Sequence, residues 1–211
     1  MFPYRDDNPS HHFPFITISL IVINTVIFFL FATQSYYEAI VFQYGFIPNE
    51  WRPVSLITAM FLHGGLFHLV FNMWFLWLFG DNLEDQLGKI IFVIFYLTGG
   101  IFSFLVHAAM TGGGIPTIGA SGAISAVMGG YVVLFPHARI RMVTFLFFYV
   151  FRWAWNAWIF LGLWFLQQLF FNFGGDTASQ IAYGAHIGGF IFGFIAMTIL
   201  KFFLPNLQKF Q

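Results

Sequence analysis

Long apolar runs separated by short polar stretches dominate the chain from Phe13 onward. A helix needs about 20 apolar residues to cross a hydrocarbon core of about 30 Å. Six runs reach or approach that length, so the pattern predicts an all-α, polytopic membrane protein with six transmembrane helices. The predicted spans are 13–33, 58–80, 90–110, 121–135, 153–173 and 178–204. Together they form a single membrane domain over residues 1–211, with no second domain and no tandem repeat.

Two stretches do not fit this pattern simply. The apolar stretch "RMVTFLFFYVF" (141–151) either extends the fifth span or lies along the membrane interface. The first loop, residues 34–57, is long and rich in aromatic residues, and it is expected to have structure of its own. The N-terminal "MFPYRDDNPSHH" has one arginine against two aspartates, and no small-residue cleavage site follows the first apolar run, so this run is expected to remain as a span.

Composition strengthens the assignment to a membrane. Of 211 residues, 59% are hydrophobic and 8% are charged, whereas a soluble domain carries about 25% charged residues. The net charge is zero and no basic block occurs, which argues against nucleic acid as a partner. The chain has no cysteine, which excludes disulfides, a thiolate nucleophile and a cysteine zinc site.

The distribution of lysine and arginine predicts the orientation. With six spans, seven of these residues lie on the side that holds both termini, and one lies on the other side. The seven are Arg5, Lys89, Arg139, Arg141, Arg152, Lys201 and Lys209, and the eighth is Arg52; without Arg152, which borders the fifth span, the ratio is six to one. Basic residues prefer cytoplasmic loops, so both termini are expected in the cytoplasm.

The fourth span is short and opens on a serine in "GASGAISA" (119–126). From Ser121 to Pro136 the chain advances 15 residues, which is about 22 Å of helix and about 8 Å less than the core. If Pro136 marks the cytoplasmic end, Ser121 lies inside the membrane slab and the loop before it dips inward. Non-helical backbone at that depth needs protein or water around it, so a small wet cavity is expected there.

Stripes of small residues predict which helix faces Ser121. The fourth and sixth spans each carry a small residue at every fourth position, and such stripes let membrane helices approach closely. The stripes are Gly122, Ala126 and Gly130 in one span, and Ala185, Gly189 and Gly193 in the other. Packing them together would bring Ser121 and His186 within hydrogen-bond reach as nucleophile and base. Alternatively the stripes serve only packing, and Ser121 is a helix N-cap.

The second span contains His63, His68 and Asn72, which are costly at membrane depth. His68 and Asn72 share a helix face and could donate to the oxyanion that forms when a serine attacks a carbonyl. The alternative is an interhelical hydrogen-bond pair. A metal site of His63, His68 and His186 is disfavoured because no carboxylate or further ligand joins them. No aspartate occupies the place of a third triad member, so a Ser–His dyad is expected.

In this order and spacing, the motifs resemble those of the rhomboid intramembrane serine proteases in their six-helix bacterial form. The likeness covers the chain from about Phe13 to Leu204. The motifs are "HGGLFHLVFNM" (63–73), "GASG" (119–122) and "AHIGG" (185–189), with "EWR" (50–52) and "GDNLEDQLG" (80–88) as further elements.

The resemblance implies roles for particular residues. Ser121 would be the nucleophile and His186 the general base, with an oxyanion hole from His68, Asn72 and the Ser121 backbone N–H. Among the supporting residues, His63 would tie the second span to the first loop, and Trp51 and Arg52 would stabilise that loop. Glu84 would brace the helix ends. The remaining supporting residues would be Gly119, Gly122 and Gly189. The fifth span and the loop after it would form the mobile side where a substrate helix enters.

The resemblance further implies transmembrane protein substrates, no cofactor, and a bacterial inner membrane as the location. One departure is Ser125, because family members often have an aromatic residue there that stacks on the catalytic histidine. Two other classes of function stay open: a catalytically inactive relative that binds membrane-protein clients, and a channel or transporter that uses the intramembrane histidines.

Overall fold

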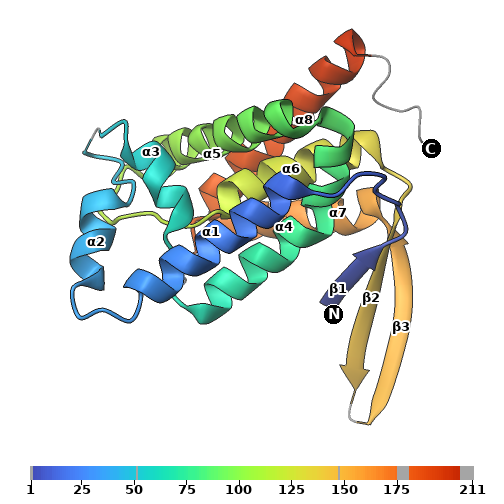
Figure 1. Cartoon of the computed structure of the whole chain (residues 1–211), viewed down its shortest axis with the longest axis horizontal. Helices are drawn as coiled ribbons and strands as arrows, with labels where there is room; N and C mark the ends of the chain where they lie inside the picture. Colours follow the sequence, from blue (N-terminus) through green and yellow to red (C-terminus); the bar gives the residue numbers. More distant parts are fainter. Residues whose placement is uncertain (1, 51, 147, 175–180, 205–211) are drawn as a thin grey trace.

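The computed structural model describes residues 2–50, 52–146, 148–174 and 181–204, which form a helical bundle with a small sheet at one end (Figure 1). The helices are α1 (Phe15–Phe31), α2 (Tyr37–Tyr44), α3 (Ser55–Thr58), the 3-10 turn η1 (Ala59–Phe61), α4 (Leu66–Leu87), α5 (Lys89–Thr111), α6 (Ser121–Leu134), α7 (Ala157–Phe173) and α8 (Tyr183–Phe203). The strands are β1 (Phe2–Asp6), β2 (Arg139–Leu146) and β3 (Tyr149–Asn156).

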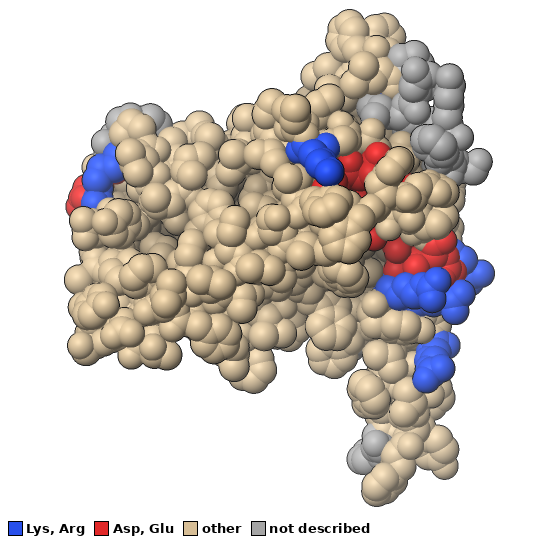
Figure 2. Space-filling model, viewed as in Figure 1, with Lys and Arg blue, Asp and Glu red and all other residues tan. Residues whose placement is uncertain are grey.

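Length and hydropathy single out some of these helices as membrane spans. Among the described residues, α5 and α8 are long and apolar enough to cross a bilayer, and α3–η1 with α4 adds a third if that pair, bent by 97°, is taken as one span. The apolar helices α1, α6 and α7 are shorter, at 17, 14 and 17 residues. Figure 2 shows few charged side chains on this face of the bundle, with wide areas free of charge between them.

Each of the six predicted ranges overlaps one long helix, but two ranges begin in other structure, and residues 178–180 of the last range lie outside the described residues. Helix α4 begins at Leu66 instead of Thr58 and continues to Leu87, because the chain first forms α3 and η1 and then bends at the two glycines before Leu66. Helix α7 begins at Ala157, and the first four residues of the predicted range 153–173 belong to β3.

The expectation of a helical membrane protein is confirmed, but the fold is not all-α: the described residues also include a three-stranded antiparallel sheet in the order β1-β2-β3. The stretch 141–151 does not extend the fifth helix. It forms most of the β2–β3 hairpin, in which Arg139 pairs with Asn156 and Leu146 with Tyr149. Aromatic and β-branched residues dominate both strands, and these residue types favour a pleated strand over a helix.

Helix α6 lies in the middle of the bundle and packs closely against α8. Most of its residues are buried. A Cβ atom built on Gly193 would lie 1.9 Å from the carbonyl oxygen of Ala126, and one on Gly129 would lie 2.2 Å from that of Phe190. Such backbone approach requires glycine, so the predicted stripes meet at Ala126 and Gly193, but the close contact near the end of α6 is made by Gly129 and not by Gly130, which faces side chains of Phe95, Leu83 and Met197.

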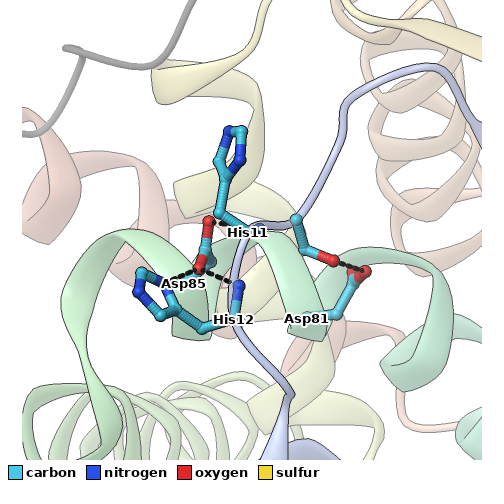
Figure 3. A network of polar contacts seen from close by, with 5 residues as sticks. His11, His12, Asp81 and Asp85 are labelled. Atoms are coloured by element: carbon cyan, nitrogen blue, oxygen red, sulfur yellow. Dashed lines mark hydrogen bonds and ion pairs between the residues drawn. The ribbon is translucent and has the colours of Figure 1, made fainter.

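The segment before α1 is held to the end of α4 by acidic side chains (Figure 3). The backbone amides of His11 and His12 donate to the Asp85 carboxylate at 3.0 and 2.9 Å, and Ser10 donates to Asp81 at 3.1 Å. Further into the bundle, Glu84 accepts from the backbone amides that begin α1. These contacts fix the position of α1 along the axis of α4.

Candidate active site

Ser121 is the first residue of α6, directly after the loop that connects α5 to α6. The N-cap position belongs to Ala120, and no side chain caps this helix. The alternative interpretation of Ser121 as an N-cap is therefore wrong. The amides of the first helical turn have no partner within a helix, so the Ser121 N–H points out of the helix end together with its positive dipole.

Ser121 and His186 lie beside close contacts between α6 and α8. A Cβ built on Gly122 would lie 3.7 Å from the carbonyl oxygen of Ala185, and one built on Gly189 would lie 2.0 Å from the carbonyl oxygen of Gly122. Ser121 and His186 each lie one residue from these contacts. Among the described residues, no hydrogen bond joins the Ser121 hydroxyl directly to the His186 ring. Catalytic hydrogen bonds are often long before substrate binds.

The His186 ring is held from α7. Its Nδ1 lies 2.8 Å from Oε1 of Gln168. Since an amide oxygen only accepts, Nδ1 carries the proton and Nε2 is left as the basic nitrogen. The ring centroid of Trp164 lies 6.0 Å from that of His186 at 32°, and the Tyr183 ring meets His186 edge-on at 6.4 Å.

Sequence reasoning missed Gln168 and Trp164. The available signal was the pair of glutamines in the apolar stretch "WFLQQLFF" (164–171), since an amide at membrane depth needs a partner. Ser125, which stands where relatives often have an aromatic residue, does not stack on His186. Its hydroxyl donates to the Ser121 carbonyl oxygen at 2.7 Å. The aromatic side chain beside the histidine comes instead from Trp164 on another helix.

His68 and Asn72 lie next to the loop that leads into α6. The amide of Gly64 donates to Nδ1 of His68 at 3.4 Å, which leaves Nε2 as the donor nitrogen. A Cβ built on Gly119 would lie 2.7 Å from His68 Nε2 and 3.7 Å from Asn72 Nδ2. The Asn72 nitrogen is buried with no hydrogen-bond partner in the protein. An unpaired buried donor costs about 1–3 kcal/mol, so a ligand oxygen at this place would find a ready partner.

Gly119 keeps this space open for two reasons. Its φ of +123° favours glycine over any other residue, and a side chain there would collide with His68. Its amide donates to the carbonyl oxygen of Ala59 at 2.9 Å, which fixes the loop against η1. Gly119 therefore positions the approach to Ser121 between η1 and α4.

The first loop is tied down by His63 and Arg52. The Tyr37 hydroxyl donates to the His63 carbonyl oxygen at 2.7 Å, so the tie runs through the His63 backbone. The His63 ring is fully buried edge-on against His68, 5.1 Å between centroids. The Arg52 guanidinium donates to the carbonyls of Phe42 and Gln43, which lie in the last turn of α2. Trp51 lies outside the described residues.

Glu84 joins α4 to α1. Its carboxylate accepts from the backbone amides of Ile16 and Thr17 at 2.9 and 2.8 Å, and from the Thr17 hydroxyl at 2.9 Å. These amides belong to the first turn of α1 and have no partner within the helix. Glu84 is far along α4 from His68 and Asn72, so its contribution is to helix placement.

The described residues include groups that an acyl-transfer site needs: a hydroxyl at a helix N-terminus, an imidazole on the facing helix with a defined tautomer, and a buried amide donor at Asn72 with no partner. Among the described residues, no group of three or more histidines, aspartates or glutamates could hold a metal ion.

Comparison with known proteins gives the family. The model of the rhomboid domain matches residues 50–202. Rhomboid protein 1, mitochondrial, of Saccharomyces cerevisiae is 34% identical over 150 residues, which cover 66% of this chain and 40% of that protein. The presenilin-associated rhomboid-like protein, mitochondrial, of Rattus norvegicus is 30% identical over 189 residues, which cover 85% of this chain and 47% of that protein.

These matches cover less than half the length of either relative, and both relatives are mitochondrial proteins. The rhomboid model, in contrast, covers well over half of this chain, from the first loop to the end of α8. The chain belongs to the rhomboid family and is an integral, multi-pass membrane protein.

Proposed function

We propose that this protein is an intramembrane serine endopeptidase that cleaves peptide bonds in or near transmembrane helices of other membrane proteins. The observation that carries the proposal is the cluster around the start of α6. It combines a hydroxyl that caps no helix, a histidine held by Gln168, and an Asn72 amide nitrogen with no partner. An unpaired buried donor is costly, and an oxyanion of the substrate would give this one a partner.

In the proposed reaction, Oγ of Ser121 attacks the scissile carbonyl carbon while Nε2 of His186 takes the hydroxyl proton. The carbonyl oxygen becomes an oxyanion that accepts from His68 Nε2, Asn72 Nδ2 and the Ser121 backbone N–H. His186 then gives its proton to the leaving amine, and an acyl-enzyme remains. Water attacks the acyl carbon with His186 again as base, which releases the acid and restores Ser121. No cofactor takes part.

Gln168 has a positioning role in this mechanism. Its carbonyl oxygen accepts from Nδ1–H of His186 and stabilises the imidazolium that forms during attack. Among these contacts, no carboxylate takes the place of a third triad member. The neutral side-chain amide of Gln168 orients His186 instead. A substrate helix must also unwind before its carbonyl can react, because its own hydrogen bonds shield the backbone. Helix-destabilising residues in the substrate should therefore favour cleavage.

For the topology, the proposal is six spans with both termini in the cytoplasm of a bacterial inner membrane. The seven-to-one distribution of lysine and arginine supports this orientation. The helices α1, α6 and α7 are short for full spans, so this proposal requires that α6 begin below the membrane surface, as the depth argument for Ser121 expects. Cysteine accessibility in a chain that naturally lacks cysteine measures the orientation directly.

Labelling with a fluorophosphonate probe in proteoliposomes tests the activity. Wild-type protein should label, and Ser121→Ala and His186→Ala should not. Cleavage of a helical reporter should be lost in the same variants. A correctly folded wild-type protein that neither labels nor cleaves would contradict the proposal. It would instead favour a catalytically inactive binder of membrane-protein clients.

A further inference from the structure

The β2–β3 hairpin projects sideways from the end of the bundle, across the direction of the helices (Figure 1). Its base is held where the segment after α6 meets the start of α7. The amide of Ala157 donates to the Ala138 carbonyl oxygen at 2.8 Å, and that of Trp158 donates to the Pro136 carbonyl oxygen at 3.0 Å. The base of the hairpin is therefore level with the end of α6 and the start of α7, and its outer part extends beyond the bundle.

The outer part of the hairpin is apolar and packs on nothing in the protein. Phe148 is 99% exposed, Tyr149 70% and Phe145 64%. No charged residue occurs from Met142 to Phe151. Soluble proteins rarely leave so large an apolar patch in water, so this surface has an occupant.

Both faces of the ribbon are apolar, which favours an occupant that surrounds it. Paired residues of an antiparallel ribbon lie on the same face. The pair Phe145–Val150 lies on one face and the pair Leu146–Tyr149 on the other, and all four side chains are more than half exposed. A second protein would cover one face or one edge, and the sheet would then show a polar face to water. A lipid phase covers both.

The backbone limits how deep the hairpin can lie. Strand β3 is the edge of the sheet, and β1 pairs with β2 only as far as Val143. Beyond that point both edges of the ribbon are open. Open edges do not occur in the hydrocarbon core, where nothing satisfies their amides and carbonyls, but the headgroup layer contains water and phosphate. A two-stranded ribbon is also only marginally stable in water alone.

Charge and aromatic residues at the inner part of the hairpin fit the same layer. Arg152 is exposed and, among the described residues, forms no ion pair. The Trp153 and Trp155 rings lie 5.7 Å apart. Figure 2 shows the charged residues at the base of the hairpin, with the outer part free of charge. Tryptophan and tyrosine concentrate at membrane interfaces, and arginine there pairs with phosphate.

We propose that the β2–β3 hairpin is an interfacial membrane anchor whose aromatic tip lies in the headgroup and upper acyl layer of an anionic leaflet, with Arg152 on lipid phosphate. The anchor fixes the depth of the bundle at the start of α7, which carries Gln168. This proposal does not depend on proteolytic activity.

Site-directed quenching tests the anchor, because the chain has no native cysteine. Phe148→Cys carries an environment-sensitive fluorophore in vesicles of phosphatidylcholine and phosphatidylglycerol. Pro9→Cys, exposed shortly after β1, which pairs with the base of β2, is the aqueous control. Ile23→Cys, exposed in the middle of α1, is the deep lipid control. Phe148 contacts nothing in the fold, so its replacement should leave thermal unfolding unchanged.

We expect the label at 148 to be quenched by nitroxide on the upper acyl chain and little by aqueous iodide. The label at 9 should show the reverse, and that at 23 should respond best to deep nitroxide. Equal iodide quenching at 148 and 9 would overturn the proposal. Protection of 148 from both quenchers, lost when the protein is diluted in lipid, would identify a second copy as the occupant and also overturn it.

The role of Arg152 has its own test. Arg152→Gln should lower the ratio of lipid-quenched to iodide-quenched label at 148 about fivefold in anionic vesicles, the effect of one basic residue near a charged leaflet. In pure phosphatidylcholine it should change little, and Arg152→Lys should behave as wild type. The same loss in both lipids would contradict pairing with anionic phosphate.

Discussion

Oε1 of Gln168 on α7 lies 2.8 Å from Nδ1 of His186 on α8. The contact determines which nitrogen of the His186 ring can act as a base, and it joins α7 to α8. Trp164, one turn earlier on α7, lies beside the same ring. The orientation of His186 therefore depends on α7, and any movement of α7 away from α8 would release the base from its partner.

Replacing Gln168 should lower the rate of the chemical step more than substrate binding. Gln168→Leu removes the acceptor for Nδ1–H while it keeps the volume, and we expect kcat to fall about 10- to 100-fold with KM little changed, since orientation of a general base is worth that much. Cleavage of a helical reporter in detergent micelles measures both constants.

Two variants separate positioning from folding. Gln167→Leu lies on the exposed side of the same helix and should leave kcat unchanged. Gln168→Glu keeps an oxygen acceptor at the same place and should recover part of the activity that Gln168→Leu loses. Equal losses in the Leu and Glu variants would show that Gln168 acts only through packing.

Close contact between α6 and α8 should be necessary for both stability and activity. A Cβ on Gly189 would lie 2.0 Å from the backbone oxygen of Gly122, so Gly189→Ala must push the two helices apart. We expect a loss of about 1–3 kcal/mol in the free energy of unfolding, typical of overpacking, and loss of probe labelling at Ser121.

The matched control is Gly162→Ala, since a Cβ at this position in α7 meets nothing within 4 Å. Its melting temperature and labelling should equal or exceed those of the wild type, because alanine favours helix over glycine. If Gly189→Ala labelled as well as Gly162→Ala, the approach of α6 to α8 would not be what places Ser121 beside His186.

The α6–α8 contact was predictable from sequence because it depends on residue size alone. The stripes Gly122–Ala126–Gly130 and Ala185–Gly189–Gly193 can be seen in the printed chain, and helix packing follows from them. The two polar residues of α4 were predictable for a similar reason, since His68 and Asn72 are four positions apart on one helix. Local periodicity carries all of this information.

The β2–β3 hairpin and the contact between Gln168 and His186 could not be predicted from the sequence. Residues 141–151 are apolar throughout, so periodicity cannot distinguish a helix from a buried or lipid-covered strand. The pairing of β1 with β2 joins residues 134 to 141 positions apart, from Asp6 with Ile140 to Phe2 with Val143, and is therefore non-local. Likewise nothing in the sequence specifies which helix turns a glutamine toward His186, because that depends on how α7 rotates against α8.

Glu84 should contribute to stability through its three acceptor contacts with Ile16 and Thr17. Glu84→Ala leaves two amides and a hydroxyl without partners at a buried helix start, and each unmet donor costs about 1–3 kcal/mol. We expect a clear fall in melting temperature in detergent. Glu38→Ala, at an exposed acidic position in the first turn of α2, is the control and should change little. Equal melting temperatures for both variants would contradict the bracing role.

The attachment of β1 should weaken as pH rises from about 4 to 7. Burial raises the pKa of Asp6 from its ordinary 3.8 to about 7, and the Tyr131 hydroxyl donates to its carboxyl group. In that range the folded protein holds a proton that the unfolded chain has lost, so stability falls as pH increases. Above pH 7 the folded state must accommodate a buried carboxylate beside Asp81.

Melting temperature in detergent from pH 5 to pH 8 measures this effect. The wild type should be more stable at pH 5 than at pH 8, whereas Asp6→Asn, which cannot ionise, should show a smaller difference. Asp7→Asn separates burial from exposed charge. Its neighbour Arg141 lowers the pKa of Asp7 through an exposed ion pair, so this variant should lose stability only above the Asp7 pKa, and by little. If the pH dependence persisted unchanged in Asp6→Asn, a group other than Asp6 would have to control the end of the bundle where β1 meets β2.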